Sequence, residues 1–307
     1  MGLRRQIAAP AGAGPGRRPP WRRGGLSLAG ALLVAVTPAV PALAVVPSHA
    51  TYAGGFLTAA APLVGARVTN GRISLEVQAI ARCAGRGPVD DRLVLRTAVG
   101  ATGSFRGHAV RTYRVRPTES RTVSLTTVGT VTDAGRAAGT LRLGVLVRRP
   151  RRPVVHCSSG VQRWEARSIS GASSGPPAPL AGVSYYGVIA QSGPMPFPLA
   201  LHVSADRSRV DTAVFRVFRR CRGVTSQDVA NNAPAIAIRP DGSFSMVQRY
   251  SRRFTDSIES FTFRFAGRFS TLRVDGTLRA TSILRALRTH GVIGHCDSGT
   301  VTWAAVP

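Results

Sequence analysis

The feature that most constrains the fold of this chain is an internal repeat. The motif C-x-S-G-x-x-x-W-x-A occurs twice, from Cys157 to Ala166 and from Cys296 to Ala305, with identical internal spacing. Three other landmarks recur in the same order. They are a lone earlier Cys (Cys83 and Cys221), a Gly-Ser-Phe segment (103–105 and 242–244) and a Gly-Thr-Leu-Arg segment (139–142 and 276–279). Such an ordered series indicates two copies of one structural unit.

The repeat predicts the division of the chain. We expect one domain over residues 45–167, a linker over 168–179 that is rich in Ser, Gly and Pro, and a second domain over 180–307. Each copy is long enough to enclose its own hydrophobic core.

Hydrophobic residues alternate with polar ones inside both copies. Ile73, Leu75 and Val77 share one face of a strand in the first copy, and Phe261 and Phe263 do so in the second. A period of two indicates strands with one buried face and one wet face. Short strands between Gly, Pro and Asp turns predict an all-β protein made of two tandem antiparallel β-sandwich domains.

Four cysteines allow three disulfide pairings. The repeat favours one bridge in each copy, Cys83 with Cys157 and Cys221 with Cys296, because the two loops are then almost equal in length. Zinc is the alternative, since His156 and His295 each precede a Cys, but neither copy has the close Cys spacing of a zinc site. We therefore predict disulfides, with no metal and no cofactor.

The two repeated tryptophans, Trp164 and Trp303, have two interpretations. Exposed aromatic rings often stack on sugars, whereas an aromatic side chain at an alternating strand position normally buries its ring. Their fixed distance from the second Cys of each copy favours packing in the core.

The pattern of Tyr-x-Gly, a lone Cys, Gly-Thr-Leu and C-x-S-G-x-x-x-W-x-A resembles an uncharacterised repeat found in small secreted proteins of actinobacteria. The resemblance covers nearly all of residues 50–307. It implies export, β-structure and the bridge in each copy, and it transfers no catalytic residue.

The first 44 residues are typical of a signal peptide. Six Arg and no acidic residue precede an apolar run from Leu26 to Val36, and Ala42-Leu43-Ala44 supplies the small-x-small pattern of a cleavage site. The apolar run is too short for a membrane span. We expect cleavage near Ala44, by the general secretory or the twin-arginine route, and a secreted mature chain without a membrane span.

The charge of the chain suggests its partners. All 41 basic residues are Arg, and the formal net charge is +27. A field of this sign attracts anionic cell-wall polymers and acidic polysaccharides, with nucleic acid as the less favoured partner. The densest cluster, Arg148, Arg149, Arg151 and Arg152, precedes Cys157, and the corresponding loop of the second copy carries Arg285 and Arg288. A GC-rich genome is the alternative source of the Arg excess.

Catalytic signatures are weak. Residues 171–175 match G-x-S-x-G, but they lie in the predicted linker with no strand-to-helix turn around them. The repeat places no pair of carboxylates in both copies. We therefore expect a non-enzymatic binding protein, with two alternatives: a secreted hydrolase whose site lies between the domains, and a protein-binding or inhibitory module. The sequence predicts neither the ligand nor the oligomeric state.

Overall fold

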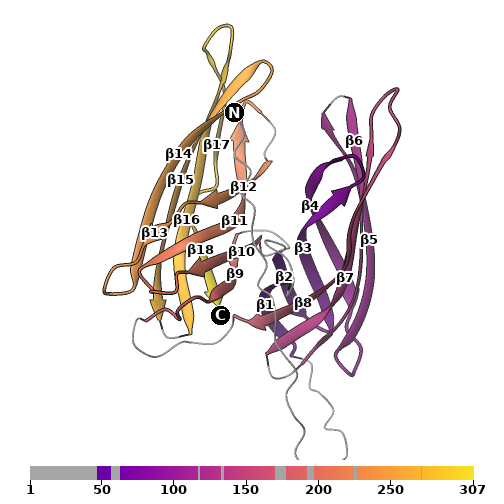
Figure 1. Ribbon diagram of the computed structural model, residues 1–307, viewed down its shortest axis with the longest axis vertical. Helices are drawn as coiled ribbons and strands as arrows, with labels where there is room; N and C mark the ends of the chain where they lie inside the picture. The colour runs from indigo at the N-terminus through magenta and orange to yellow at the C-terminus, as the bar shows by residue number, and fades with distance from the viewer. Residues whose placement is uncertain are drawn as a thin grey trace, which may run out of the picture. The chain divides into compact units, whose positions relative to one another are not determined.

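The computed structural model describes residues 47–56, 63–116, 118–132, 135–169, 178–191, 197–224, 227–270 and 272–307. All the regular secondary structure within these ranges consists of β-strands, and every strand pairing is antiparallel (Figure 1). None of the described residues forms a helix that is long and apolar enough to cross a membrane. The predicted signal peptide, 1–44, lies outside the described residues, as do residues 170–177 of the predicted linker.

Half one of the protein, residues 47–169, is built on a single eight-stranded sheet. Its strand order is β4-β3-β2-β1-β8-β7-β6-β5, so two four-stranded meanders meet where β1 pairs with β8. The strands are β1 (His49–Phe56), β2 (Leu63–Thr69), β3 (Arg72–Cys83), β4 (Arg86–Ala98), β5 (Ser104–Arg116), β6 (Glu119–Val131), β7 (Arg136–Arg148) and β8 (Val155–Ser168).

Half two, residues 178–307, repeats this arrangement in a ten-stranded sheet. The main order is β12-β11-β10-β9-β18-β16-β15-β14, while β13 pairs with β11, and β17 pairs with β11 and β16. The strands are β9 (Ser184–Ala190), β10 (Phe197–Val203), β11 (Arg209–Arg222), β12 (Gln227–Ala233), β13 (Ile236–Ala237), β14 (Ser243–Arg253), β15 (Ser257–Ser270), β16 (Arg273–Ala286), β17 (Val292–Asp297) and β18 (Val301–Val306). Strand β8 of half one thus corresponds to β17 and β18 of half two.

Each sheet turns back on itself at its disulfide. Strand β2 is seven residues long and pairs with β3 only as far as Gln78. Beyond that point β3 continues and pairs directly with β8, where Cys83 lies opposite Cys157 and is bonded to it. Half two repeats the crossing with Cys221 of β11 opposite Cys296 of β17. The prediction of an all-β protein with two disulfide-closed antiparallel domains is confirmed, and the layers of each domain are the two arms of one continuous sheet.

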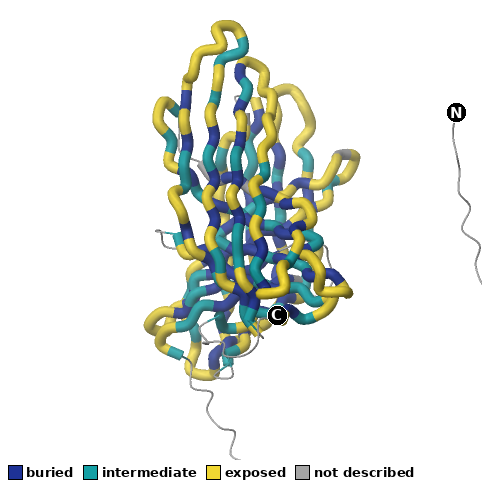
Figure 2. Tube along the Cα trace, turned by 90° about the vertical axis from the view of Figure 1, so that its left-hand side faces the viewer, coloured by how far each residue is buried: buried dark blue, intermediate teal, exposed yellow. Residues whose placement is uncertain are grey.

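A separate hydrophobic core fills the space between the arms of each sheet. The core of half one draws residues from all eight strands, and buried positions alternate with exposed ones along them (Figure 2). Trp164 and Trp303 are 1% and 2% exposed. Trp303 stacks on Phe265 with ring centroids 4.9 Å apart, and Trp164 contacts Phe105. Both indole rings therefore belong to the cores, where they are out of reach of a sugar.

The repeated Ser-Gly of the C-x-S-G motif has a structural role. Ser159 Oγ accepts a hydrogen bond from the backbone N–H of Leu143 on the neighbouring strand, and Ser298 Oγ accepts one from Ala280. The following glycines, Gly160 and Gly299, both have positive φ. The serine hydroxyl thus satisfies a donor that the strand leaves unpaired where it bulges.

The repeated Gly-Thr-Leu segment supports the tryptophan. A Cβ on Gly276 would lie 2.1 Å from the carbonyl oxygen of Ala266 and 2.4 Å from Cζ2 of Trp303. Gly139, the counterpart in half one, would place a Cβ 2.2 Å from the carbonyl oxygen of Val128. Only glycine allows these close approaches.

We predict that Gly276→Ala destabilises the protein by on the order of 3 kcal/mol, because neither the backbone carbonyl nor the packed indole can move aside. Gly291→Ala is the matched control in the same half, since its Cβ would meet only Thr289 Oγ1 at 3.4 Å. That change should stay within about 0.5 kcal/mol. Denaturant unfolding followed by circular dichroism measures both, and equal stabilities of the two variants would contradict the assignment.

Candidate functional site

The predicted arginine cluster lies at the end of a hairpin. Strand β7 ends at Arg148 and β8 begins at Val155, so residues 149–154 form the connecting loop. Arg148, Arg151 and Arg152 are exposed, and the N–H of Arg152 donates to the carbonyl of Arg149 to close the turn. This loop, together with Arg148, is called the half-one tip.

The structure places Arg285 and Arg288 at the equivalent hairpin of half two. Cys157 pairs with Val145 on β7, and Cys296 pairs with Ser282 on β16, so the β7–β8 and β16–β17 loops both close the hairpin that begins at the bridge. Each loop contains one non-glycine residue with positive φ, Arg151 in the first and His290 in the second. Arg285 and Arg288 are both exposed. The two basic loops are thus structural counterparts.

Arg149 differs from the other arginines of the half-one tip because it holds a carboxylate. Its Nε and Nη2 atoms donate to Glu119 Oε2 at 2.8 and 2.6 Å. Glu119 is 6% exposed and also accepts from Arg121 Nε at 3.1 Å. Arg149 therefore anchors the loop to the sheet, and Arg148, Arg151 and Arg152 remain exposed to solvent.

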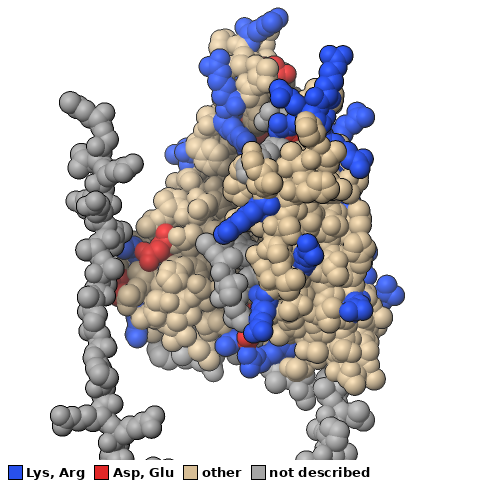
Figure 3. All heavy atoms as spheres, turned by 45° about the vertical axis from the view of Figure 1, so that its right-hand side comes forward, with Lys and Arg blue, Asp and Glu red and all other residues tan. Residues whose placement is uncertain are grey.

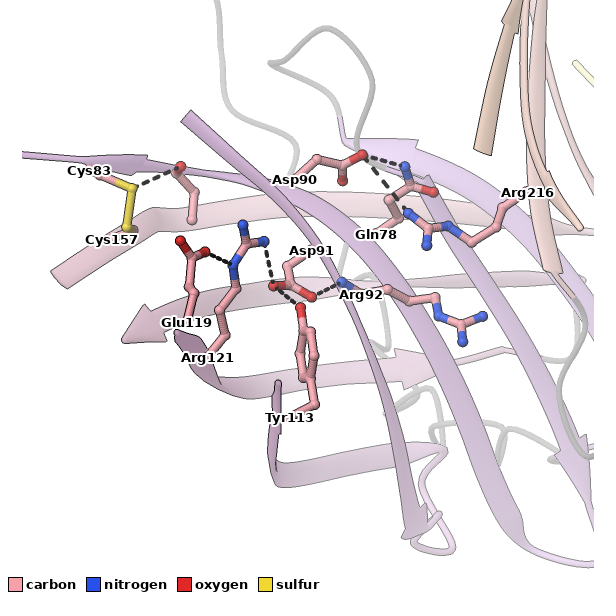
Figure 4. A network of polar contacts seen from close by, with 11 residues as sticks. Gln78, Cys83, Asp90, Asp91, Arg92, Tyr113, Glu119, Arg121, Cys157 and Arg216 are labelled. Atoms are coloured by element: carbon pink, nitrogen blue, oxygen red, sulfur yellow. Dashed lines mark hydrogen bonds and ion pairs between the residues drawn. A yellow bond between two sulfur atoms is a disulfide. The ribbon is translucent and has the colours of Figure 1, made fainter. Parts of the chain in front are cut away.

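The anchor continues inward as a chain of polar contacts (Figure 4). Arg121 Nη1 lies 3.6 Å from Asp91 Oδ2, and the Tyr113 hydroxyl donates to the same oxygen at 2.5 Å. Asp91 is 6% exposed and also accepts from the N–H of Arg92. Burial, the hydrogen bond to Asp91 and the charge of that carboxylate raise the pKa of Tyr113 to about 12. Acidic and basic groups alternate along this series of contacts, so the negative charge of each buried carboxylate is balanced by an arginine.

A surface hollow of about 460 Å³ adjoins the half-one tip. Its walls combine guanidinium groups with aliphatic side chains, so it offers an anion both charge and a partly desolvated surface. The lining residues are Gly85, Val147, Arg149, Arg152, Pro153 and Val155.

Half two adds a second hairpin that the sequence analysis did not select. The β14–β15 turn lies beside the β16–β17 loop, and the N–H of Leu287 donates to the carbonyl of Asp256 at 2.9 Å to join them. Exposed Arg252 and Arg253 end β14 at this turn. The two joined hairpins, 252–257 and 285–293, are called the half-two tip. The adjacent Arg pair next to Phe254, where β14 stops alternating, was the signal that could have identified it.

Acidic side chains neutralise some of the arginines away from the tips. Arg209 pairs with Asp211 at 2.6 Å and Arg273 with Asp275 at 2.7 Å in half two. Among the described residues no carboxylate lies within ion-pair distance of Arg252, Arg253, Arg285 or Arg288, or of the three exposed arginines Arg148, Arg151 and Arg152 of the half-one tip. On the face drawn in Figure 3, basic side chains gather at the upper end and acidic ones are few there.

The other residues singled out from the sequence are the cysteines, the histidines beside them and the G-x-S-x-G match. All four cysteines form disulfides, and His156 and His295 are exposed beside them. No group of three His, Cys, Asp or Glu side chains in the described residues is arranged to hold a metal ion. The G-x-S-x-G match at 171–175 lies outside the described residues.

Comparisons with known proteins add no relative. No protein-family model matches the chain, and no curated protein matches it significantly in sequence.

We predict that Tyr113→Phe destabilises the protein by about 1–3 kcal/mol at neutral pH, because buried Asp91 loses a hydrogen-bond donor. The raised pKa favours neutral Tyr113 in the folded state, so its contribution is complete below pH 10 and is lost as the pH rises from 10 to about 12. Alkaline destabilisation should therefore be smaller in the variant. Denaturant midpoints across this range test it, and parallel pH profiles for the two proteins would contradict it.

Proposed function

We propose that the protein is exported and acts as a non-enzymatic binding protein that adheres to an anionic cell-surface polymer through its arginine tips. The observation that supports this most directly is the placement of exposed arginines, free of ion pairs with any described carboxylate, at equivalent hairpins of both halves. Guanidinium groups bind phosphate and carboxylate in a two-pronged geometry. A cell-wall polymer or an acidic polysaccharide presents such groups in series.

Export is supported from two directions. The leader, 1–44, has the order of a signal peptide, with a cleavage site near Ala44. The two disulfides are typical of proteins that fold in an oxidising compartment. A secreted protein meets the surface polymers of its own cell first.

Duplication supports binding. Two tips on one chain raise the avidity for a polymer that repeats the same anionic group, even where each tip binds weakly. Retention should then fall steeply with salt, because each anionic group bound by arginine releases counterions.

The test is co-sedimentation of residues 45–307 with isolated envelope polymers and with DNA across a salt series. We predict that Arg148→Gln, Arg151→Gln and Arg152→Gln together weaken retention on the polymer by about tenfold or more, because each charge-assisted contact contributes roughly 1.5–3 kcal/mol. Arg149 stays in place, since it holds Glu119.

The matched control removes the same charge elsewhere in half one. Arg96, Arg106 and Arg163 are exposed on strands and lie far from the tip along them. Their triple change to Gln should leave retention almost intact. Equal losses in the two variants would mean that dispersed charge binds the polymer, and absence of sedimentation at low salt would refute the proposal. Stronger retention on DNA than on any envelope polymer would replace the polymer with nucleic acid as the ligand.

A further inference from the structure

The half-two tip differs from a simple cationic surface because apolar side chains project among its arginines. Phe254, in the β14–β15 turn, is 40% exposed, and Val292 and Ile293, at the start of β17, are 56% and 44% exposed. The guanidinium carbon of Arg252 lies over the Phe254 ring, 5.4 Å from its centroid. A hydrophilic polymer gains nothing from this exposure, so the apolar residues indicate a different partner.

These apolar side chains lie on segments that run side by side. Strand β15 begins with Ser257 opposite Ala286 of β16, and Arg285 of β16 lies opposite Val292 of β17. The bond from the N–H of Leu287 to the carbonyl of Asp256 holds the two hairpins together. Phe254 and Val292 therefore belong to the same end of the sheet, with basic residues between them.

We propose that the half-two tip docks on the surface of an anionic lipid bilayer. Phe254, Val292 and Ile293 enter the boundary between headgroups and acyl chains, and Arg252, Arg253 and Arg288 bind lipid phosphates. Arginine suits this position because its aliphatic stem lies along apolar surface while its charged end stays among the headgroups. The inference goes beyond polymer adhesion, since it assigns half two a partner that binds apolar side chains as well as charge.

The backbone at this tip is prepared for such a surface. The N–H groups of Phe254, Ala286 and His290 donate to the carbonyls of Ser257, Gly291 and Ala286. Backbone groups that are already paired lose little when water is excluded from them. These three donors can therefore approach the acyl boundary at little cost.

Basic side chains outnumber acidic ones at the end of half two that faces the bilayer. Asp256 is the acidic residue in the β14–β15 turn, and its Oδ1 accepts from the hydroxyl of Ser257. Glu259, further along β15, is buried and bound to Arg219. The exposed basic side chains at this end outnumber them, and they are Arg222, Arg252, Arg253, Arg285, Arg288, His290 and His295.

The half-one tip lacks this combination. Val115 and Val154 are the large hydrophobic residues exposed near its loops in the described part of half one, and no aromatic side chain accompanies them. Both halves share the cationic hairpin, and half two adds the apolar residues that a bilayer requires.

The test is vesicle flotation with residues 45–307. We predict flotation with vesicles of phosphatidylglycerol and phosphatidylcholine, and none with phosphatidylcholine alone. Phe254→Ser with Ile293→Ser should weaken binding to the anionic vesicles by about tenfold or more, because two apolar side chains no longer leave water. Arg252→Gln with Arg253→Gln should also weaken it and should flatten its salt dependence.

The matched control is Val247→Ser with Leu272→Ser, which removes two exposed apolar side chains of half two that lie away from this tip. It should float like the unchanged protein. Circular dichroism establishes that each variant is folded. Equal flotation of the tip variant and the unchanged protein would overturn the proposal, as would displacement from the vesicles by inorganic phosphate at matched ionic strength.

Polymer binding separates this inference from the proposed function. Phe254→Ser with Ile293→Ser keeps every arginine, so its co-sedimentation with the envelope polymer should be unchanged while flotation is lost. If the folded variant loses both activities, the apolar residues serve the polymer, and the bilayer is not their partner. If the unchanged protein floats but binds no polymer, the bilayer inference holds and polymer adhesion fails.

Discussion

The structure depends on the point where each sheet meets itself. Because β1 and β2 are short, the longer β3 passes beyond them and pairs with β8, and the bond between Cys83 and Cys157 fixes that crossing. A flat eight-stranded sheet would leave one apolar face in water, whereas the crossing turns two arms toward one core. The hairpins that continue past the bridge have little core left to cover, so their ends are available for polar and charged residues. The same crossing in half two leaves the ends of its hairpins equally available for polar and charged residues.

What the two halves share is mostly scaffold. The repeated serine completes a strand, the repeated glycines make room for a carbonyl or an indole ring, and the tryptophans fill the cores. The buried charges are different in each half. Half one has the chain of contacts from Tyr113 to Arg149, whereas half two encloses Arg219, which is 1% exposed, bonded to Glu259 at 2.9 Å, and 5.0 Å from the ring centroid of Phe261. Differences in function between the halves therefore arise from residues outside the repeated motif.

The sequence predicted the strands and bridges well because both leave local or repeated signals. Alternation identified the faces of β3 and β15, and equal loop lengths favoured the disulfide pairing that the structure confirms. It could not predict that each domain is one sheet, since the pairing of β1 with β8 joins segments about 110 residues apart. Nor did it show that Arg149 is held by Glu119, which lies thirty positions earlier in the chain. The Arg252 and Arg253 pair was overlooked because nothing in the other copy repeats it.

The position of the acidic residues decides which arginines are paired. A GC-rich genome would raise the number of arginines along the whole chain, but it would not determine which of them meet a carboxylate. In half two, Asp211 and Asp275 are paired with arginine away from the tip, and Glu259 forms an ion pair with buried Arg219. Charges that are paired in this way contribute little to the field outside the protein, so that field comes from the unpaired arginines, among them those at the hairpin ends. The composition alone gives a basic protein, and the arrangement of its few acids leaves Arg148, Arg151 and Arg152 of one tip and Arg252, Arg253, Arg285 and Arg288 of the other without an ion pair among the described residues.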